Sequence, residues 1–89
     1  MIKLNMKIED IKERLTLNFK NDRVEVFDTR GTGDHFSLVV ISDKFIDVSL
    51  VERHRMIYTI FEDKIVTEIH ALQIQAYTIA EWKKKKISN

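Results

Sequence analysis

The spacing of apolar side chains changes from a helical to a strand-like period part-way along the chain. Apolar residues three or four apart predict a helix over about residues 6–17; they are Ile8, Ile11, Leu15 and Phe19. Two alternating runs follow, Val24 with Val26 and then residues 36–40, and each predicts a strand. Both glycines of the chain lie between these runs, so the short link over residues 28–34 predicts an antiparallel hairpin.

The second half of the chain returns to a helical period after a connector over residues 42–48, which has room for a helical turn. Ser49 and Glu52 have the spacing of a capping box, which opens a helix. The apolar stripe of this helix is predicted to consist of Val51, His54, Tyr58, Phe61 and Ile65. Residues 70–77 alternate once more and predict a third strand.

The resulting order is α-β-β-α-β-α, which is typical of one α+β domain over residues 1–89. A second capping box, Thr78 with Glu81, supplies the short last helix. A strand, a crossover helix and another strand favour a parallel pair, which makes the three-stranded sheet mixed. The N-terminal ends of strands two and three then share an edge with the glycine loop. Those ends are His35 and His70.

Composition excludes several classes of function. Fifteen basic and 14 acidic residues leave a formal charge of +1, which excludes a general polyanion binder but leaves room for local basic patches. The chain has no cysteine, so it can form neither a disulfide framework nor a thiolate metal site by itself. Met1–Asp10 carries charge and no long apolar run. We therefore expect a cytoplasmic protein without a signal peptide or membrane span.

The three histidines are the first candidates for chemistry, because histidine is the commonest metal ligand. His54 lies on the predicted apolar stripe and is expected to pack against the sheet, so His54→Ala is expected to lower stability by roughly 1–3 kcal/mol. That packing would rule out a zinc site built from all three histidines. Strict alternation points His35 and His70 through opposite faces of the sheet, but residues at strand ends escape this rule.

Enzyme activity is not expected. The serines Ser37, Ser42 and Ser49 lack a plausible histidine–aspartate arrangement, and no pair of carboxylates stands out in an apolar surrounding. We expect the chain to bind rather than to catalyse.

Five short runs, in order and at the spacing of a known family, cover nearly the whole chain. They are residues 34–36 (Asp-His-Phe), 40–45 (Val-Ile-Ser-Asp-Lys-Phe), 49–58 (Ser-Leu-Val-Glu-Arg-His-Arg-Met-Ile-Tyr), 69–72 (Ile-His-Ala-Leu) and 76–82 (Ala-Tyr-Thr-Ile-Ala-Glu-Trp). In these runs the chain resembles the BolA family. Its short hairpin is most similar to the bacterial branch that includes the acid-stress BolA-like proteins.

The resemblance implies a fold like the class II KH domain, with helices on one face of the sheet. It also implies an adaptor in iron–sulfur cluster trafficking or iron regulation, which pairs with a monothiol glutaredoxin and shares a [2Fe-2S] cluster. His70 matches the first ligand of the family, and His35 is the candidate for the second. The glutaredoxin side would add its cysteine and glutathione. The loop residues Gly31, Thr32, Gly33 and Asp34 would lie at the interface.

Other parts of this expectation concern the chain alone. Without its partner it is expected to hold no cofactor and to be a monomer or a weak homodimer. A chain without cysteine must borrow sulfur ligands, because Fe–S centres usually take thiolates and histidine pairs occur in Rieske centres.

The chain departs from the family pattern in three places. The hairpin loop holds no Cys or His before Asp34, so His35 is the only nearby candidate for the second ligand. Ile79 stands where family members often have proline, which costs helix preorganisation but no chemistry. A Gly-x-x-Gly segment is absent, which argues against RNA binding of the KH type.

A DNA-binding stress-response regulator is the alternative function, since the resemblance also includes a transcription-factor role. Arg53 and Arg55 flank His54 and are expected to point to solvent, where they could contact phosphates. Lys83 and Lys84 begin a lysine run on the last helix, which could bind DNA, meet an acidic patch on the glutaredoxin, or simply be solvated near the helix end. The small net charge argues against DNA.

Overall fold

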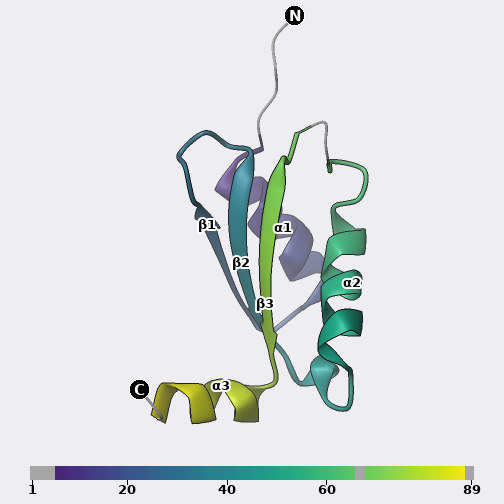
Figure 1. Ribbon diagram of the computed structural model, residues 1–89. Coiled ribbons are helices and arrows are strands. Elements are labelled where there is room, and N and C mark those ends of the chain that lie inside the picture. Colours follow the sequence, from purple (N-terminus) through teal and green to yellow (C-terminus); the bar gives the residue numbers. More distant parts are fainter. Residues whose placement is uncertain (1–5, 66–67, 88–89) are drawn as a thin grey trace, which may run out of the picture.

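The computed structural model describes residues 6–65 and 68–87 of the 89-residue chain. Along this part the elements follow in the predicted order (Figure 1). They are α1 (Ile8–Asn18), β1 (Arg23–Asp28), β2 (His35–Ile41), the 3₁₀ turn η1 (Asp43–Phe45), α2 (Leu50–Ile60), β3 (Ala71–Tyr77) and α3 (Ile79–Ile87). The predicted α+β class is therefore confirmed, and the connector before α2 does contain a short helical turn.

The described strands form one mixed sheet in the order β1-β2-β3. β1 pairs with β2 antiparallel, as expected of a hairpin, and β2 pairs with β3 parallel, as expected of a strand–helix–strand unit. In the parallel pair His35 is the register partner of Ala71. The N-terminal ends of β2 and β3 therefore meet at the edge where the β1–β2 loop also lies (Figure 1).

Helices α1 and α2 cover one face of the sheet and enclose the core with it (Figure 1). The almost fully buried side chains come from both helices, from β2 and from η1; they include Ile11, Leu15, Phe36, Leu38, Val40, Phe45, Ile57 and Phe61. In β2 this core takes every second residue, as the alternation of a strand requires, while Val39 and Ile41 on the other face are buried as well. Burial of each such side chain contributes roughly 1.5–3 kcal/mol.

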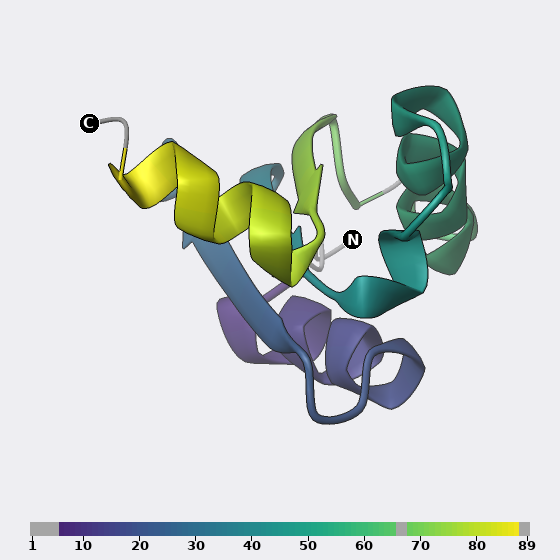
Figure 2. The ribbon, with the colours of Figure 1, turned by 90° about the horizontal axis from the view of Figure 1, so that it is seen from below.

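Helix α3 lies across the end of the sheet opposite the β1–β2 loop (Figure 1). It is on the other side of the strands from α1 (Figure 2). Its Trp82 ring is 5.3 Å from the ring of Tyr77, and the Arg23 guanidinium lies 5.6 Å from the Trp82 centroid. Thr78 and Glu81 form the predicted capping box in both directions, with distances of 2.8 and 3.2 Å. No helix in the described part of the chain could cross a membrane.

The orientation of α2 differs from the prediction. Its buried positions are Arg53 and Ile57, followed by Phe61 at the C-terminal end, whereas His54 and Tyr58 are exposed. The predicted packing of His54 and the predicted exposure of Arg53 were therefore both wrong. The cause is Arg53: its charge makes that side of the helix resemble a solvent face, although the whole side chain is buried and its nitrogens donate to protein acceptors.

Candidate functional site

The structure brings His35 and His70 together at the N-terminal ends of β2 and β3. His35 is the first residue of β2, and His70 comes directly before β3. Their ring centroids are 6.1 Å apart and the ring planes are nearly perpendicular. The alternation rule that sets them on opposite faces does not apply, because His70 lies outside the strand.

Asp34 lies between the two rings. The Nδ1 atom of His35 is hydrogen-bonded to Oδ1 of Asp34 at 2.8 Å, and Nδ1 of His70 lies 3.2 Å from Oδ2. The hydroxyl of Thr32 also donates to Oδ1. An ionised carboxylate only accepts hydrogen bonds, so we assign the hydrogen of each ring to Nδ1. The Nε2 atom of each ring then has a lone pair that can bind a metal ion or accept a hydrogen bond.

The main chain of Asp34 reinforces this arrangement. Its carbonyl oxygen accepts from the backbone N–H of His70 at 2.7 Å and from that of Ala71 at 3.2 Å. The same residue therefore joins the β1–β2 loop to the start of β3 through both its carboxylate and its carbonyl. The Asp34 side chain is buried, His35 is half-buried, and the His70 side chain is 46% exposed, so His70 is open to a partner.

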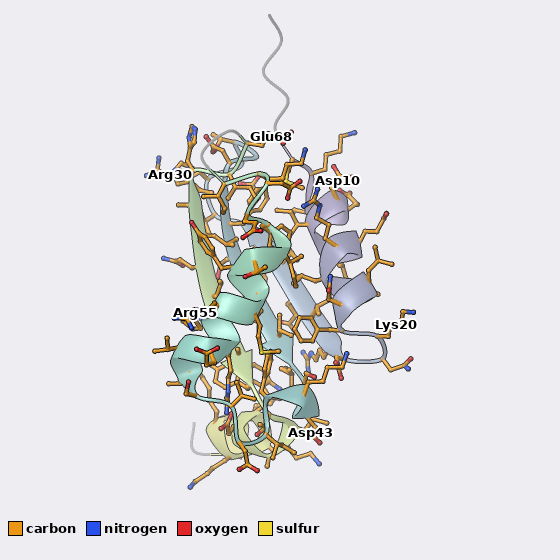
Figure 3. All side chains as sticks on the ribbon, turned by 90° about the vertical axis from the view of Figure 1, so that its right-hand side faces the viewer. Asp10, Lys20, Arg30, Asp43, Arg55 and Glu68 are labelled. Atoms are coloured by element: carbon orange, nitrogen blue, oxygen red, sulfur yellow. The ribbon has the colours of Figure 1, made fainter. Side chains whose placement is uncertain are left out.

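The loop before Asp34 is held by a second carboxylate. Asp28 accepts from the backbone N–H of Gly31 at 2.8 Å and from that of Gly33 at 2.9 Å. Both glycines have positive φ, 69° and 74°, which favours glycine at these positions. Arg30 in this loop and Glu68 near the start of β3 lie at the same end of the molecule, whereas Asp43 lies at the other (Figure 3). The predicted interface residues Gly31, Thr32 and Gly33 thus surround the histidine edge.

This edge offers two imidazole nitrogens and no complete metal site. Within residues 6–65 and 68–87, no group of three or more His, Cys, Asp or Glu could hold a metal ion. The two carboxylate oxygens of Asp34 contact the Nδ1 atoms of the two rings. Histidines that bind a metal through one nitrogen usually make such a contact through the other nitrogen. The ring nitrogens of His35 and His70 could fill part of the coordination of an iron–sulfur centre, whereas a chain without cysteine offers no thiolate for the rest.

His54 lies in a different place, beside a groove between α2 and β3. This groove has a volume of about 620 Å³ and is lined by His54, Arg55, Tyr58, Thr59, Leu72, Gln73 and Ile74. The alternative of a zinc site built from all three histidines is therefore contradicted in the described part of the chain.

Arg53 is enclosed by hydrogen-bond acceptors rather than exposed to phosphates. Its Nε donates to the Val48 carbonyl at 2.8 Å, and Nη1 donates to the Ala76 carbonyl at 3.2 Å. Both terminal nitrogens bind the Glu81 carboxylate, at 2.6 and 3.1 Å. Bonds from Arg53 and from the Thr78 backbone lower the pKa of Glu81 to about 2.

The roles of Arg53 and Asp34 were missed, although the sequence carries a signal for each. Arg53 stands four residues before Ile57 and eight before Phe61, which is the spacing of one helical face. Asp34 precedes His35 and was predicted only as an interface residue. Arg55 is exposed and pairs with Glu52, so of the two arginines considered for DNA it alone remains accessible.

Lys83 and Lys84 are both exposed on α3, as the alternative function requires. Farther along, Lys85 donates to the Tyr77 hydroxyl at 2.8 Å.

The fold is a small α+β domain with two histidines at one edge of its sheet. The model of the BolA-like protein family matches residues 7–81, and the chain belongs to this family. It is 37% identical over 81 residues to the DNA-binding transcriptional regulator BolA of Escherichia coli, covering 83% of this chain and 77% of that protein.

Solved structures agree with this assignment. The BolA domain of SufE1 from Arabidopsis thaliana is similar with a TM-score of 0.77 at 36% identity, covering 88% of this chain and 98% of that one. The solution structure of BolA1 from Mus musculus has a TM-score of 0.77 at 26% identity, covering 89% of this chain and 70% of that one.

Proposed function

We propose that this chain is an adaptor in iron–sulfur cluster trafficking or iron regulation, which binds a monothiol glutaredoxin and shares a [2Fe-2S] cluster with it. The observation that carries this proposal is the pair His35 and His70, whose Nδ1 atoms face one carboxylate. Each ring then presents Nε2, and metal-ligating histidines usually have their other nitrogen anchored in this way.

The composition of the chain supports a site divided between two proteins. This side can supply nitrogen but no sulfur, because the chain has no cysteine. Fe–S clusters are usually held by thiolates, and the family resemblance assigns these to the glutaredoxin cysteine and glutathione. In this proposal His70 and His35 bind the cluster, and Gly31, Thr32 and Gly33 contact the glutaredoxin.

We further propose that the protein is cytoplasmic, has no enzyme activity, and is a monomer or weak homodimer without cofactor when alone.

The test is anaerobic cluster reconstitution with a monothiol glutaredoxin and glutathione, with and without this chain, followed by visible circular dichroism. We expect a new spectrum when the chain is present, and we expect His70→Ala to abolish it. His54→Ala is the matched control, because His54 is exposed beside the α2–β3 groove rather than at the histidine edge. A glutaredoxin spectrum that the chain leaves unchanged would refute the proposal.

DNA binding is the second candidate, because the Escherichia coli relative is named a DNA-binding transcriptional regulator. The exposed side chains of Arg55, Lys83 and Lys84 could contact phosphates, whereas Arg53 could not without leaving its buried partners. A salt titration of duplex binding decides this case, since affinity that depends on phosphate contacts falls steeply with salt. Weak binding with a flat salt dependence would remove DNA as a candidate.

A further inference from the structure

On the basis of the shared-cluster function proposed above, we infer that Asp34 is a positioning residue for both histidines. Its carboxylate holds the two rings with Nδ1 facing inward, so that the Nε2 atoms of His35 and His70 form a ligand pair before any partner arrives. Asp34 itself does not bind the metal. Its role is to fix which nitrogen of each ring faces outward.

The geometry carries this inference because one buried carboxylate serves both rings. Oδ1 lies 2.8 Å from Nδ1 of His35, and Oδ2 lies 3.2 Å from Nδ1 of His70. Thr32 donates its hydroxyl to Oδ1 and so restrains the carboxylate from the loop side. The Asp34 side chain is only 12% exposed, which limits competition from water for its oxygens. Two rings from segments far apart in the sequence are thus contacted by a single group.

The backbone of the two loop glycines is held by a different carboxylate, so this role can be separated from the contact with the rings. Asp28 binds the backbone N–H groups of Gly31 and Gly33 with its two carboxylate oxygens. Asp34 contacts the imidazoles instead. A variant at Asp28 should therefore disturb the loop and leave the ring nitrogens as they are, whereas a variant at Asp34 should do the reverse.

The first test reads the ring nitrogens directly in the isolated, ¹⁵N-labelled full chain. The spectra are long-range ¹H–¹⁵N spectra recorded at a single pH of about 8, where ordinary imidazoles are neutral. They report which nitrogen of each histidine ring carries the hydrogen. We expect His35 and His70 to carry it on Nδ1, with the exposed His54 as an internal reference. If either His35 or His70 carries its hydrogen on Nε2 in the wild-type chain, the inference is overturned without any variant.

Asp34→Asn sharpens this test. Asparagine offers one acceptor oxygen and an NH₂ group that only donates, so it cannot accept from both rings through two oxygens. We expect at least one ring to lose its Nδ1–H form while the amide spectrum of the rest of the chain persists. Asp28→Asn is the control and should leave both rings unchanged. Unchanged rings in Asp34→Asn would overturn the inference.

The second test uses Zn²⁺ alone as a probe of the ligand pair, so it does not depend on the glutaredoxin. We expect Asp34→Asn to weaken Zn²⁺ binding by about 10–100-fold, the usual effect of removing the group behind a metal-binding histidine. His70→Ala should abolish binding, and Asp28→Asn should not alter it. Equal Zn²⁺ affinity in wild type and Asp34→Asn would refute the positioning role but not the shared cluster. If the tautomers and the Zn²⁺ affinities are as expected but no glutaredoxin-dependent spectrum appears, the shared cluster is refuted and the positioning role is not.

Discussion

Each end of the sheet has a carboxylate that joins groups from different segments, and the two ends differ in what those groups leave available. At one end Asp34 faces His35 and His70 through their Nδ1 atoms. At the other end Glu81 binds the Arg53 guanidinium and the Thr78 backbone N–H. The histidine end keeps two ring nitrogens directed elsewhere, whereas at the arginine end Nε, Nη1 and Nη2 all donate to protein acceptors.

This difference separates the proposed binding site from a structural contact within the fold. The Arg53 side chain is 7% exposed and links α2 to β3 and to the start of α3, so its charge is used within the fold. The His70 side chain is 46% exposed and has only one of its nitrogens at the carboxylate. The two clusters therefore differ in how many donors and acceptors remain for a partner.

The largest expected effect is at the histidine end. We expect His35→Ala to remove as much of the shared-cluster circular dichroism as His70→Ala, because each ring supplies one of two ligands. The unfolding free energy should fall by about 1 kcal/mol, because His35 is half-buried and its ring is hydrogen-bonded to Asp34. The measurement is reconstitution with glutaredoxin and glutathione, paired with urea unfolding. A full spectrum in His35→Ala would show that the second ligand lies elsewhere.

At the arginine end the expected effect is on stability. Arg53→Ala should lower the unfolding free energy by about 3 kcal/mol, the lower end for breaking a buried ion pair, because Glu81 is partly exposed. Denaturant unfolding measures this loss. Arg55→Ala is the control and should cost about 0.5 kcal/mol or less, since its pair with Glu52 is exposed. If Arg53→Ala is as stable as the wild type but binds duplex DNA more weakly, Arg53 contacts phosphates rather than stabilising the fold.

A smaller and pH-dependent effect is expected for Glu81→Gln. The pKa of Glu81 is lowered from 4.5 to about 2, first by the hydrogen bonds from Arg53. Ionised Glu81 therefore stabilises the fold above pH 4.5, and this contribution is lost as the pH falls towards 2. We expect Glu81→Gln to cost about 1.5 kcal/mol at neutral pH, the low end for a charged hydrogen bond.

The comparison to make is between wild type and Glu81→Gln in denaturant titrations at a series of pH values. Their difference in unfolding free energy should shrink over the acidic window. A difference that stays constant with pH would contradict the role of the ionised carboxylate.

The smallest effect is expected for His54→Ala. His54 is exposed on α2, so its removal should change the unfolding free energy by no more than about 0.5 kcal/mol. It should also leave the glutaredoxin-dependent spectrum in place. Thermal or denaturant unfolding checks the first point. A loss above about 1 kcal/mol, typical of a disrupted buried group, would instead support the packing expected from the apolar stripe.

The helices, the strands and the pairing of β2 with β3 could be predicted from local features of the sequence. Alternation placed the strands, capping residues placed the starts of α2 and α3, and the strand–helix–strand order predicted the parallel pairing of β2 with β3. From that pairing alone, His35 and His70 could be expected at one edge of the sheet. These features are local because backbone hydrogen bonding and side-chain period are set by near neighbours.

Tertiary structure decided the features that depend on distant partners. Whether α2 turns Arg53 or His54 inward depended on acceptors from three other segments, Val48, Ala76 and Glu81. A charge can be buried only where such partners converge, and a helical pattern does not contain them. Likewise, which nitrogen of each histidine faces outward depended on Asp34, which reaches His70 only after β2 and β3 have paired. The sequence by itself thus determined the elements and the shared edge, while the assembled fold determined which groups at that edge remain available to bind.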